Sequence, residues 1–136
     1  MNPTQYLSLA EVIALHESAM RRLGVAPTPL RDEGTLESAV MRPQMAAYYE
    51  AADVIKQAAL LGTGISQAQA FLDGNKRTAY LALNTFLRMN GLTYSGDRLE
   101  LAKQFEQLGE RSSEPEAAIE AFEAWLRPYV QPHPEQ

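Results

Sequence analysis

The segment from residue 75 to residue 90 constrains the fold of this chain more than any other. Its apolar residues fall on nearly every side of a helix rather than on one stripe: Ala79, Tyr80, Leu81, Ala82, Leu83, Phe86, Leu87 and Met89. A helix that is apolar all round must be covered by other elements, so it belongs at the centre of a domain. Gly91, directly after it, is a typical residue at the C-terminal end of a helix.

Four further segments have apolar residues at helical spacing and can supply that cover. They are residues 9–23, 53–68, 97–109 and 113–129, and three of them begin with a capping-box pair: Ser8 with Glu11, Asp97 with Glu100, and Ser113 with Glu116. Gly62 and Gly64 fall inside the second segment. They either weaken that helix or let a neighbouring helix pack closely against it.

The region between residues 24 and 52 is less regular. Pro27 and Pro29 indicate a loop, and a short helix is expected over residues 36–41, because Pro43 disfavours helix at the residue before it. Residues 44–52 include Tyr48 and Tyr49 and fit either an extended flap or an irregular helix.

These patterns predict an all-α fold of about six helices packed around the helix at 75–90. No strand pattern is found. The chain is long enough for one domain of ordinary size, placed at residues 1–130. Residues 131–136 contain two prolines and are expected to form a flexible tail.

Composition excludes several classes of protein. The formal net charge is -5 and no block of like charge occurs, which argues against direct nucleic-acid binding through a basic surface but allows a local cationic pocket. The absence of cysteine excludes disulfides and thiolate metal sites. The first residues lack the layout of a signal peptide, and no apolar run reaches the ~20 residues of a membrane span. We therefore expect a cytoplasmic protein without a membrane contact.

The loop before the central helix carries the candidate chemistry. Gly74 permits a sharp turn, and the first amides of the helix have no partner within it. The helix dipole favours an anion at that end, where Lys76 and Arg77 add two cations. Asp73 is a carboxylate that can hold Mg²⁺ beside a polyphosphate, and Asn75 can donate to a phosphate or cap the helix. The loop therefore predicts a phosphate site.

The alternative interpretation is that residues 73–75 form an ordinary turn and cap, with Lys76 and Arg77 simply solvated. The helix that follows argues against it. Two cations at the positive end of a buried helix are electrostatically unfavourable unless an anion compensates them.

The motif Phe71-Leu72-Asp73-Gly74-Asn75-Lys76-Arg77-Thr78 resembles the core motif of the Fic/Doc superfamily, and its Lys-Arg form resembles the death-on-curing (Doc) branch. Residues 6–16 resemble the opening helix of that branch, and residues 30–43 resemble its second signature. Phe86-Leu87 with Asn90-Gly91 resembles the end of its central helix. The resemblance covers most of residues 6–91, with several motifs in the right order.

The resemblance implies a helical fold that modifies a protein hydroxyl with a nucleotide. Fic members mostly transfer a nucleotidyl group, whereas Doc-type members transfer phosphate to a translation factor. The latter are toxins that cause growth arrest, and a small antitoxin covers their active-site groove. By the resemblance, ATP or another nucleoside triphosphate is the substrate, Asp73 holds Mg²⁺, Gly74 and Asn75 help to form the anion cradle, and Lys76 and Arg77 bind phosphates.

Gln69 departs from the family pattern. The family has a histidine two residues before the phenylalanine, where it acts as general base on the target hydroxyl. An amide cannot take a proton near neutral pH, so we expect nucleotide binding with strongly impaired transfer. His16, on an apolar helix face, is interpreted as a core or partner-contact residue, and His133 as a solvated tail residue.

Three hypotheses remain open from the sequence. The first is a Doc-like toxin whose site is divergent or deliberately disabled. The second is a family member that uses Gln69 to orient a hydroxyl rather than to deprotonate it. The third is a non-catalytic module that keeps the fold as a nucleotide- or partner-binding surface.

Overall fold

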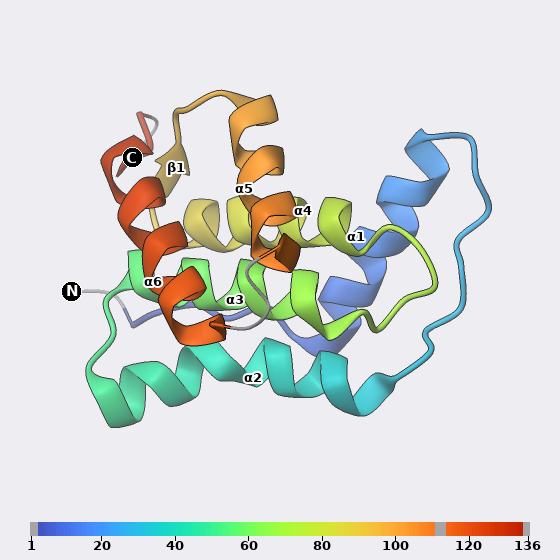
Figure 1. Ribbon diagram of the computed structural model, residues 1–136, viewed down its shortest axis with the longest axis horizontal. Coiled ribbons are helices and arrows are strands. Elements are labelled where there is room, and N and C mark those ends of the chain that lie inside the picture. The colour runs from blue at the N-terminus through green and yellow to red at the C-terminus, as the bar shows by residue number, and fades with distance from the viewer. Residues whose placement is uncertain (1–2, 111–113, 135–136) are drawn as a thin grey trace.

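The computed structural model describes residues 3–110 and 114–134 of the chain. In these residues six α-helices, one short 3-10 helix and two short strands follow one another (Figure 1). In chain order they are α1 (Leu9–Arg22), α2 (Glu33–Glu50), α3 (Val54–Ala68), α4 (Asn75–Met89), β1 (Leu92–Tyr94), α5 (Arg98–Glu110), α6 (Pro115–Leu126), η1 (Arg127–Tyr129) and β2 (Val130–Pro132). The predicted all-α class is confirmed.

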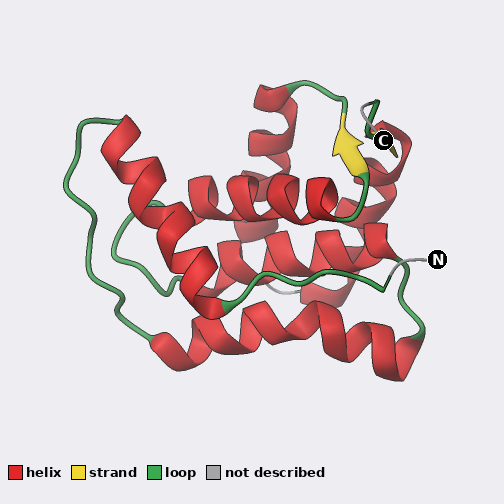
Figure 2. Cartoon of the chain, turned by 180° about the vertical axis from the view of Figure 1, so that it is seen from behind, coloured by secondary structure: helices red, strands yellow, loops and turns green. Residues whose placement is uncertain are grey.

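The helices α2, α3 and α4 run side by side as rows, α1 crosses one end of them, and α5 and α6 cross the face toward the viewer (Figure 1). Seen from behind, the segment before α1 runs along the row of α3 (Figure 2). Tyr6 ties that segment down, because its hydroxyl donates to Gln57 Oε1 at 2.8 Å. Within the described residues, none of the helices combines the length and the apolar character that crossing a membrane requires.

The predicted central helix is α4, and it shares the centre with α3. The inward residues of α4 from Thr78 to Leu87 are buried, but α3 is enclosed on more sides, with buried residues at nine positions. Gly62 explains how α3 accepts such close neighbours. A Cβ atom at Gly62 would lie 3.0 Å from Leu83 Cδ1 and 3.2 Å from the Phe105 ring. The glycine therefore permits close packing and does not interrupt the helix.

The expected short helix at 36–41 is wrong, because α2 runs unbroken from Glu33 to Glu50 with Pro43 inside it. A proline in a helix interior costs about 3 kcal/mol through its missing N–H and a ring clash. Pro43 is buried together with Leu36, Ala39, Val40 and Ala46, so the packing of this helix offsets that cost. Of the two alternatives for residues 44–52, the structure shows helix up to Glu50, with Tyr48 and Tyr49 exposed on its last turns.

The prediction that the chain has no strand is also wrong. β1 and β2 pair antiparallel, with Leu92 opposite Pro132 and Tyr94 opposite Val130. Gln131 and Pro132 therefore form part of a small sheet, although they were expected in a flexible tail. Each strand has three residues, too few to show an alternating pattern in the sequence. Residue 113, the expected cap of the last helix, lies outside the described residues.

A charged contact joins the end of α6 to the start of α3. Arg127 donates to both carboxylate oxygens of Asp53, at 2.8 and 3.1 Å, and to Glu123 Oε2 at 2.8 Å. Asp53 also caps α3, because its Oδ1 accepts from the Lys56 N–H. The hydrogen bond from Arg127 is the main cause that lowers the pKa of Asp53 below its usual range.

We expect Arg127→Ala to lower the free energy of unfolding at neutral pH by up to about 1 kcal/mol, since the pair is half exposed and screened by solvent. A lowered folded pKa gives stability that is present above the unfolded value of 3.8 and is lost as the pH falls through the folded value. The difference between variant and wild type in urea unfolding should therefore shrink in acid. Lys103→Ala, which breaks a more exposed pair with Glu100, is the control. A difference that is constant across this pH range would contradict the account.

Candidate active site

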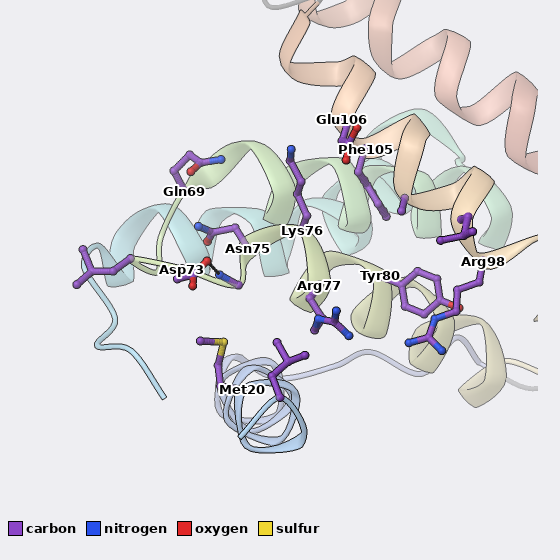
Figure 3. Close-up of a pocket in the computed structure, with 15 residues that line it drawn as sticks. Met20, Gln69, Asp73, Asn75, Lys76, Arg77, Tyr80, Arg98, Phe105 and Glu106 are labelled. Carbon is purple, nitrogen blue, oxygen red and sulfur yellow. Dashed lines mark hydrogen bonds between the residues drawn. The ribbon is translucent and has the colours of Figure 1, made fainter. Parts of the chain in front are cut away.

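A cavity of about 560 Å³ opens at the N-terminal end of α4 (Figure 3). Its volume lies within the ~300–1,000 Å³ typical of small-molecule sites. Every site residue predicted from the sequence lines it: Gln69, Asp73, Gly74, Asn75, Lys76 and Arg77. The remaining walls come from the end of α1 and from one face of α5. The structure thus brings the predicted residues together in one concave site.

The turn into α4 requires a glycine. Gly74 is the N-cap residue and has a φ of 84° in the left-handed region. A Cβ atom there would lie 2.8 Å from Met20 Sδ and 3.2 Å from the His16 ring. The N–H of Gly74 donates to Asp73 Oδ1 at 2.8 Å, which fixes the carboxylate beside the helix start.

Asn75 holds the loop in shape with its side chain. Its Oδ1 accepts from the Phe71 N–H at 3.1 Å, and its Nδ2 donates to the Phe71 carbonyl at 2.9 Å. The residue is buried, and both ends of its amide are engaged. The side chain therefore does not cap α4, and its oxygen and nitrogen both bond the backbone of Phe71, so the main group that Asn75 offers a phosphate is its backbone N–H.

The segment before α2 supports the same loop from outside. Arg31 and Asp32 both donate their backbone N–H to the Ala70 carbonyl, at 2.6 and 3.2 Å. The Arg31 guanidinium also donates to the Gln69 carbonyl at 2.6 Å. These contacts attach the loop to the segment before α2. The sequence showed only that residues 30–43 form a motif, and did not show what that motif touches.

His16 is a core residue, as one of the two interpretations of the sequence held. Its ring stacks on Phe71, with centroids 3.7 Å apart and planes 7° from parallel, and it is 1% exposed. His16 Nε2 lies 2.9 Å from the Asp73 carbonyl oxygen and donates to it in the Nε2–H tautomer. The Thr28 hydroxyl donates to the same oxygen at 3.3 Å. α1 therefore positions the residue that carries the carboxylate.

We expect His16→Phe to keep the stacking on Phe71 and to lose the hydrogen bond to Asp73. Such a bond contributes about 1 kcal/mol, so the free energy of unfolding should fall by about that amount. Thr28→Val, which removes the second donor, should have a smaller effect because its bond is longer. Urea unfolding of the two variants measures this. Equal stability of His16→Phe and wild type would show that the hydrogen bond does not hold the loop.

The start of α4 differs electrostatically from that of the helices before it. Ser8, Asp32 and Asp53 cap α1, α2 and α3 with side-chain oxygens. α4 has no side-chain cap, so its first backbone N–H groups face the cavity without a side-chain acceptor. In residues 3–110 and 114–134, neither Lys76 nor Arg77 forms an ion pair. Uncapped amides and two cations without an ion-pair partner in this part of the chain favour an anion at this position.

Gln69 stands at the edge of this cavity. It ends α3 in the left-handed region, with a φ of 52°. Its side chain folds back on the helix, where Nε2 donates to the Ser66 carbonyl at 3.0 Å. Figure 3 shows its amide on the same side of the cavity as Lys76. The group can accept a hydrogen bond through Oε1 but cannot take a proton.

The donor set around Asp73 limits how a metal could bind. Over the described part of the chain, no group of three His, Cys, Asp or Glu side chains gathers closely enough to hold an ion. Mg²⁺ in nucleotide sites is commonly held by one or two carboxylates together with phosphates and waters. Asp73 is exposed on the cavity and fits that arrangement, in which the phosphates complete the coordination.

Comparison with known proteins shows the family of this chain. A model of the Fic/DOC family matches residues 6–87. The chain belongs to the Fic/DOC family. It is 35% identical over 96 residues to a protein named Toxin Doc from Mycolicibacterium smegmatis, covering 69% of this chain and 71% of that one. It is also 35% identical over 89 residues to Protein kinase doc from Escherichia phage P1, covering 65% of this chain and 70% of that one.

The Fic/DOC match includes the loop and most of α4 but ends before α5. Five cavity residues that the sequence reasoning missed come from that helix: Arg98, Leu99, Ala102, Phe105 and Glu106. Tyr80, also missed, follows Lys76 by one helical turn, and this spacing places it on the same face of α4. The α5 residues carry no such signal, because their place at the cavity depends on how α5 packs across α4.

Proposed function

We propose that this chain is a Doc-like toxin that binds a nucleoside triphosphate with Mg²⁺ and is impaired in transferring phosphate, or a nucleotidyl group, to a protein hydroxyl. One observation carries the proposal: an uncapped helix start lies beside Asp73 in a ligand-sized cavity with Gln69 at its edge, and its Lys76 and Arg77 have no ion-pair partner among the described residues. The similarity to one protein named a toxin and another named a protein kinase supports the biological class.

Each residue of the site has a distinct role in this proposal. The backbone N–H groups at the start of α4, with Lys76 and Arg77, bind the phosphates and stabilise the charge that develops on them. Asp73 holds Mg²⁺, which when bound neutralises phosphate charge. His16 and Asn75 keep the loop in the geometry that places these groups.

The transfer step explains the importance of Gln69. The hydroxyl oxygen of the target attacks phosphorus, the bond to the leaving phosphate oxygen breaks, and the hydroxyl proton must pass to an acceptor. General-base help of this kind is typically worth ~10²–10⁴-fold in rate. Gln69 can orient the hydroxyl through Oε1 but leaves its proton to water. Because phosphoryl transfer depends mainly on positioning and electrostatics, a slow residual reaction is expected.

The proposal extends to partners. We infer a small antitoxin that covers the cavity, a protein target in the translation machinery, and action in the cytoplasm. Direct nucleic-acid binding is not part of the proposal, because the chain is acidic overall. The second candidate, a non-catalytic nucleotide- or partner-binding module, is favoured by Gln69, an amide at the position where the family resemblance leads us to expect a base.

Transfer from labelled ATP to proteins of a bacterial extract tests the function. We expect slow labelling of one protein by γ-labelled ATP and none by α-labelled ATP, since Lys76 in the motif favours phosphate transfer. Asp73→Ala should abolish it, whereas Glu37→Ala, which removes an exposed carboxylate outside the cavity, should not. Labelling by α-labelled ATP would indicate nucleotidyl transfer. Nucleotide binding without any labelling would favour the non-catalytic module.

A further inference from the structure

The end of the cavity opposite the loop is formed by a different pair of residues, Tyr80 and Arg98. Figure 3 shows Gln69 and Asp73 at one end, Lys76 and Arg77 along the middle, and Tyr80 with Arg98 at the other end. The guanidinium of Arg98 lies over the Tyr80 ring, with Cζ 5.5 Å from the ring centroid. The two residues come from different helices, α4 and α5, so this pair closes one end of the cavity.

The backbone that carries Arg98 is fixed. Asp97 caps α5, because its Oδ1 accepts from the Leu99 N–H at 2.6 Å and from the Glu100 N–H at 3.3 Å. The Asp97 carbonyl in turn accepts from the Tyr94 hydroxyl at 2.6 Å. Arg98, the first residue of α5, is thus held where it can reach over Tyr80.

The chemistry at this end suits a flat aromatic group better than another phosphate. Leu99 is 71% exposed on the same wall, and Leu23 is 51% exposed on the wall that α1 forms. These apolar side chains cannot bind a phosphate. A nucleobase packed against them would remove their surface from water, which is favourable. The guanidinium and the aromatic ring each have a planar surface, on which aromatic bases stack readily. The cradle at the other end already supplies the amides and cations that phosphates need.

We propose that Tyr80 and Arg98 form the base-binding end of the cavity and make it selective for purine nucleotides. This inference rests on the proposed nucleotide site and adds its specificity. A purine offers more stacking surface than a pyrimidine, so ATP and GTP should bind more tightly than CTP and UTP. Arg98 lies beyond residues 6–87, the part of the chain that the family model matches.

Titration of the protein with Mg-ATP, Mg-CTP and inorganic tripolyphosphate tests the proposal. Arg98→Ala should weaken ATP binding about tenfold, within the range for loss of a stacking contact, and leave tripolyphosphate binding unchanged. Arg98→Lys keeps the positive charge but lacks the planar guanidinium group, so it should bind ATP as weakly as Arg98→Ala. Lys103→Ala removes a cation from the solvent side of the same helix and should change nothing. Thermal unfolding of each variant checks that the fold is intact.

The outcomes separate this proposal from the proposed function. If Arg98→Ala weakens tripolyphosphate and ATP equally, or Arg98→Lys restores binding, then Arg98 contacts phosphate and the base-end assignment is wrong. If wild-type protein binds tripolyphosphate as tightly as ATP, the proposed phosphate site is supported and the proposed base-binding end is wrong. If wild-type protein binds neither, both proposals fail together.

Discussion

Replacing Gln69 with histidine is expected to raise the rate of transfer from ATP by about 10²–10⁴-fold, the usual value of a general base. The backbone at Gln69 has a φ of 52°, a left-handed conformation that histidine adopts more readily than most residues. The side chain is exposed at the cavity edge, so a larger ring has room. An imidazole that is largely neutral near pH 7 can take the hydroxyl proton that the amide cannot.

The measurement is labelling of the protein target by γ-labelled ATP, together with growth of a bacterial host that expresses the variant. Gln67→His is the matched control, because it places the same side chain two residues away on an exposed position that does not line this cavity. We expect growth arrest with Gln69→His and none with Gln67→His. If neither labelling nor growth changes with Gln69→His, a missing base is not what limits this protein.

Replacing Lys76 and Arg77 with alanine is expected to weaken nucleotide binding while making the fold more stable. Hydrogen bonds to charged groups contribute about 1.5–3 kcal/mol, so each change should reduce affinity by roughly 10–100-fold. The same cations lie at the positive end of α4 without an ion-pair partner in the described part of the chain. Removing each should raise the free energy of unfolding by about 0.3–1 kcal/mol.

Arg88, on the same helix, provides a control, because its replacement should change the stability in the opposite direction. It lies in the last turn of α4, where a cation is favourable, and it does not line the cavity. Arg88→Ala should therefore lower stability slightly and leave nucleotide affinity unchanged. Calorimetric titration and urea unfolding of the three variants test this. A loss of both binding and stability in the Lys76 and Arg77 variants would mean that these residues hold the fold together rather than serve a ligand.

The sequence predicted what depends on local pattern. The start of α4 at Asn75 and the capping box of α1 at Ser8 and Glu11 are confirmed, and the motif residues line one cavity. Each follows from spacing along the chain, either of apolar residues on a helix or of ligand-binding groups in one loop. The resemblance to the Fic/Doc superfamily, drawn from residues 6–91, is confirmed by the family match over residues 6–87, and the resemblance to the Doc branch by the two relatives.

What the sequence did not predict depends on contacts between distant segments. Local preference disfavours a helix through Pro43, and only its burial inside α2 shows why the helix continues. The side chain of Asn75 offered several hydrogen bonds, and the return of the chain at Phe71 decides which ones form. Arg98 meets Tyr80 only because β1 and the Asp97 cap place the start of α5 over α4.

The central claim is that this chain keeps a phosphate site although it lacks the catalytic base, and titration of wild-type protein with Mg-ATP tests it most directly. We predict saturable binding within the millimolar range of ATP that is lost in Asp73→Ala and retained in Glu37→Ala. Failure of wild-type protein to bind Mg-ATP at millimolar concentration, with no difference between wild type and Asp73→Ala, would contradict the claim.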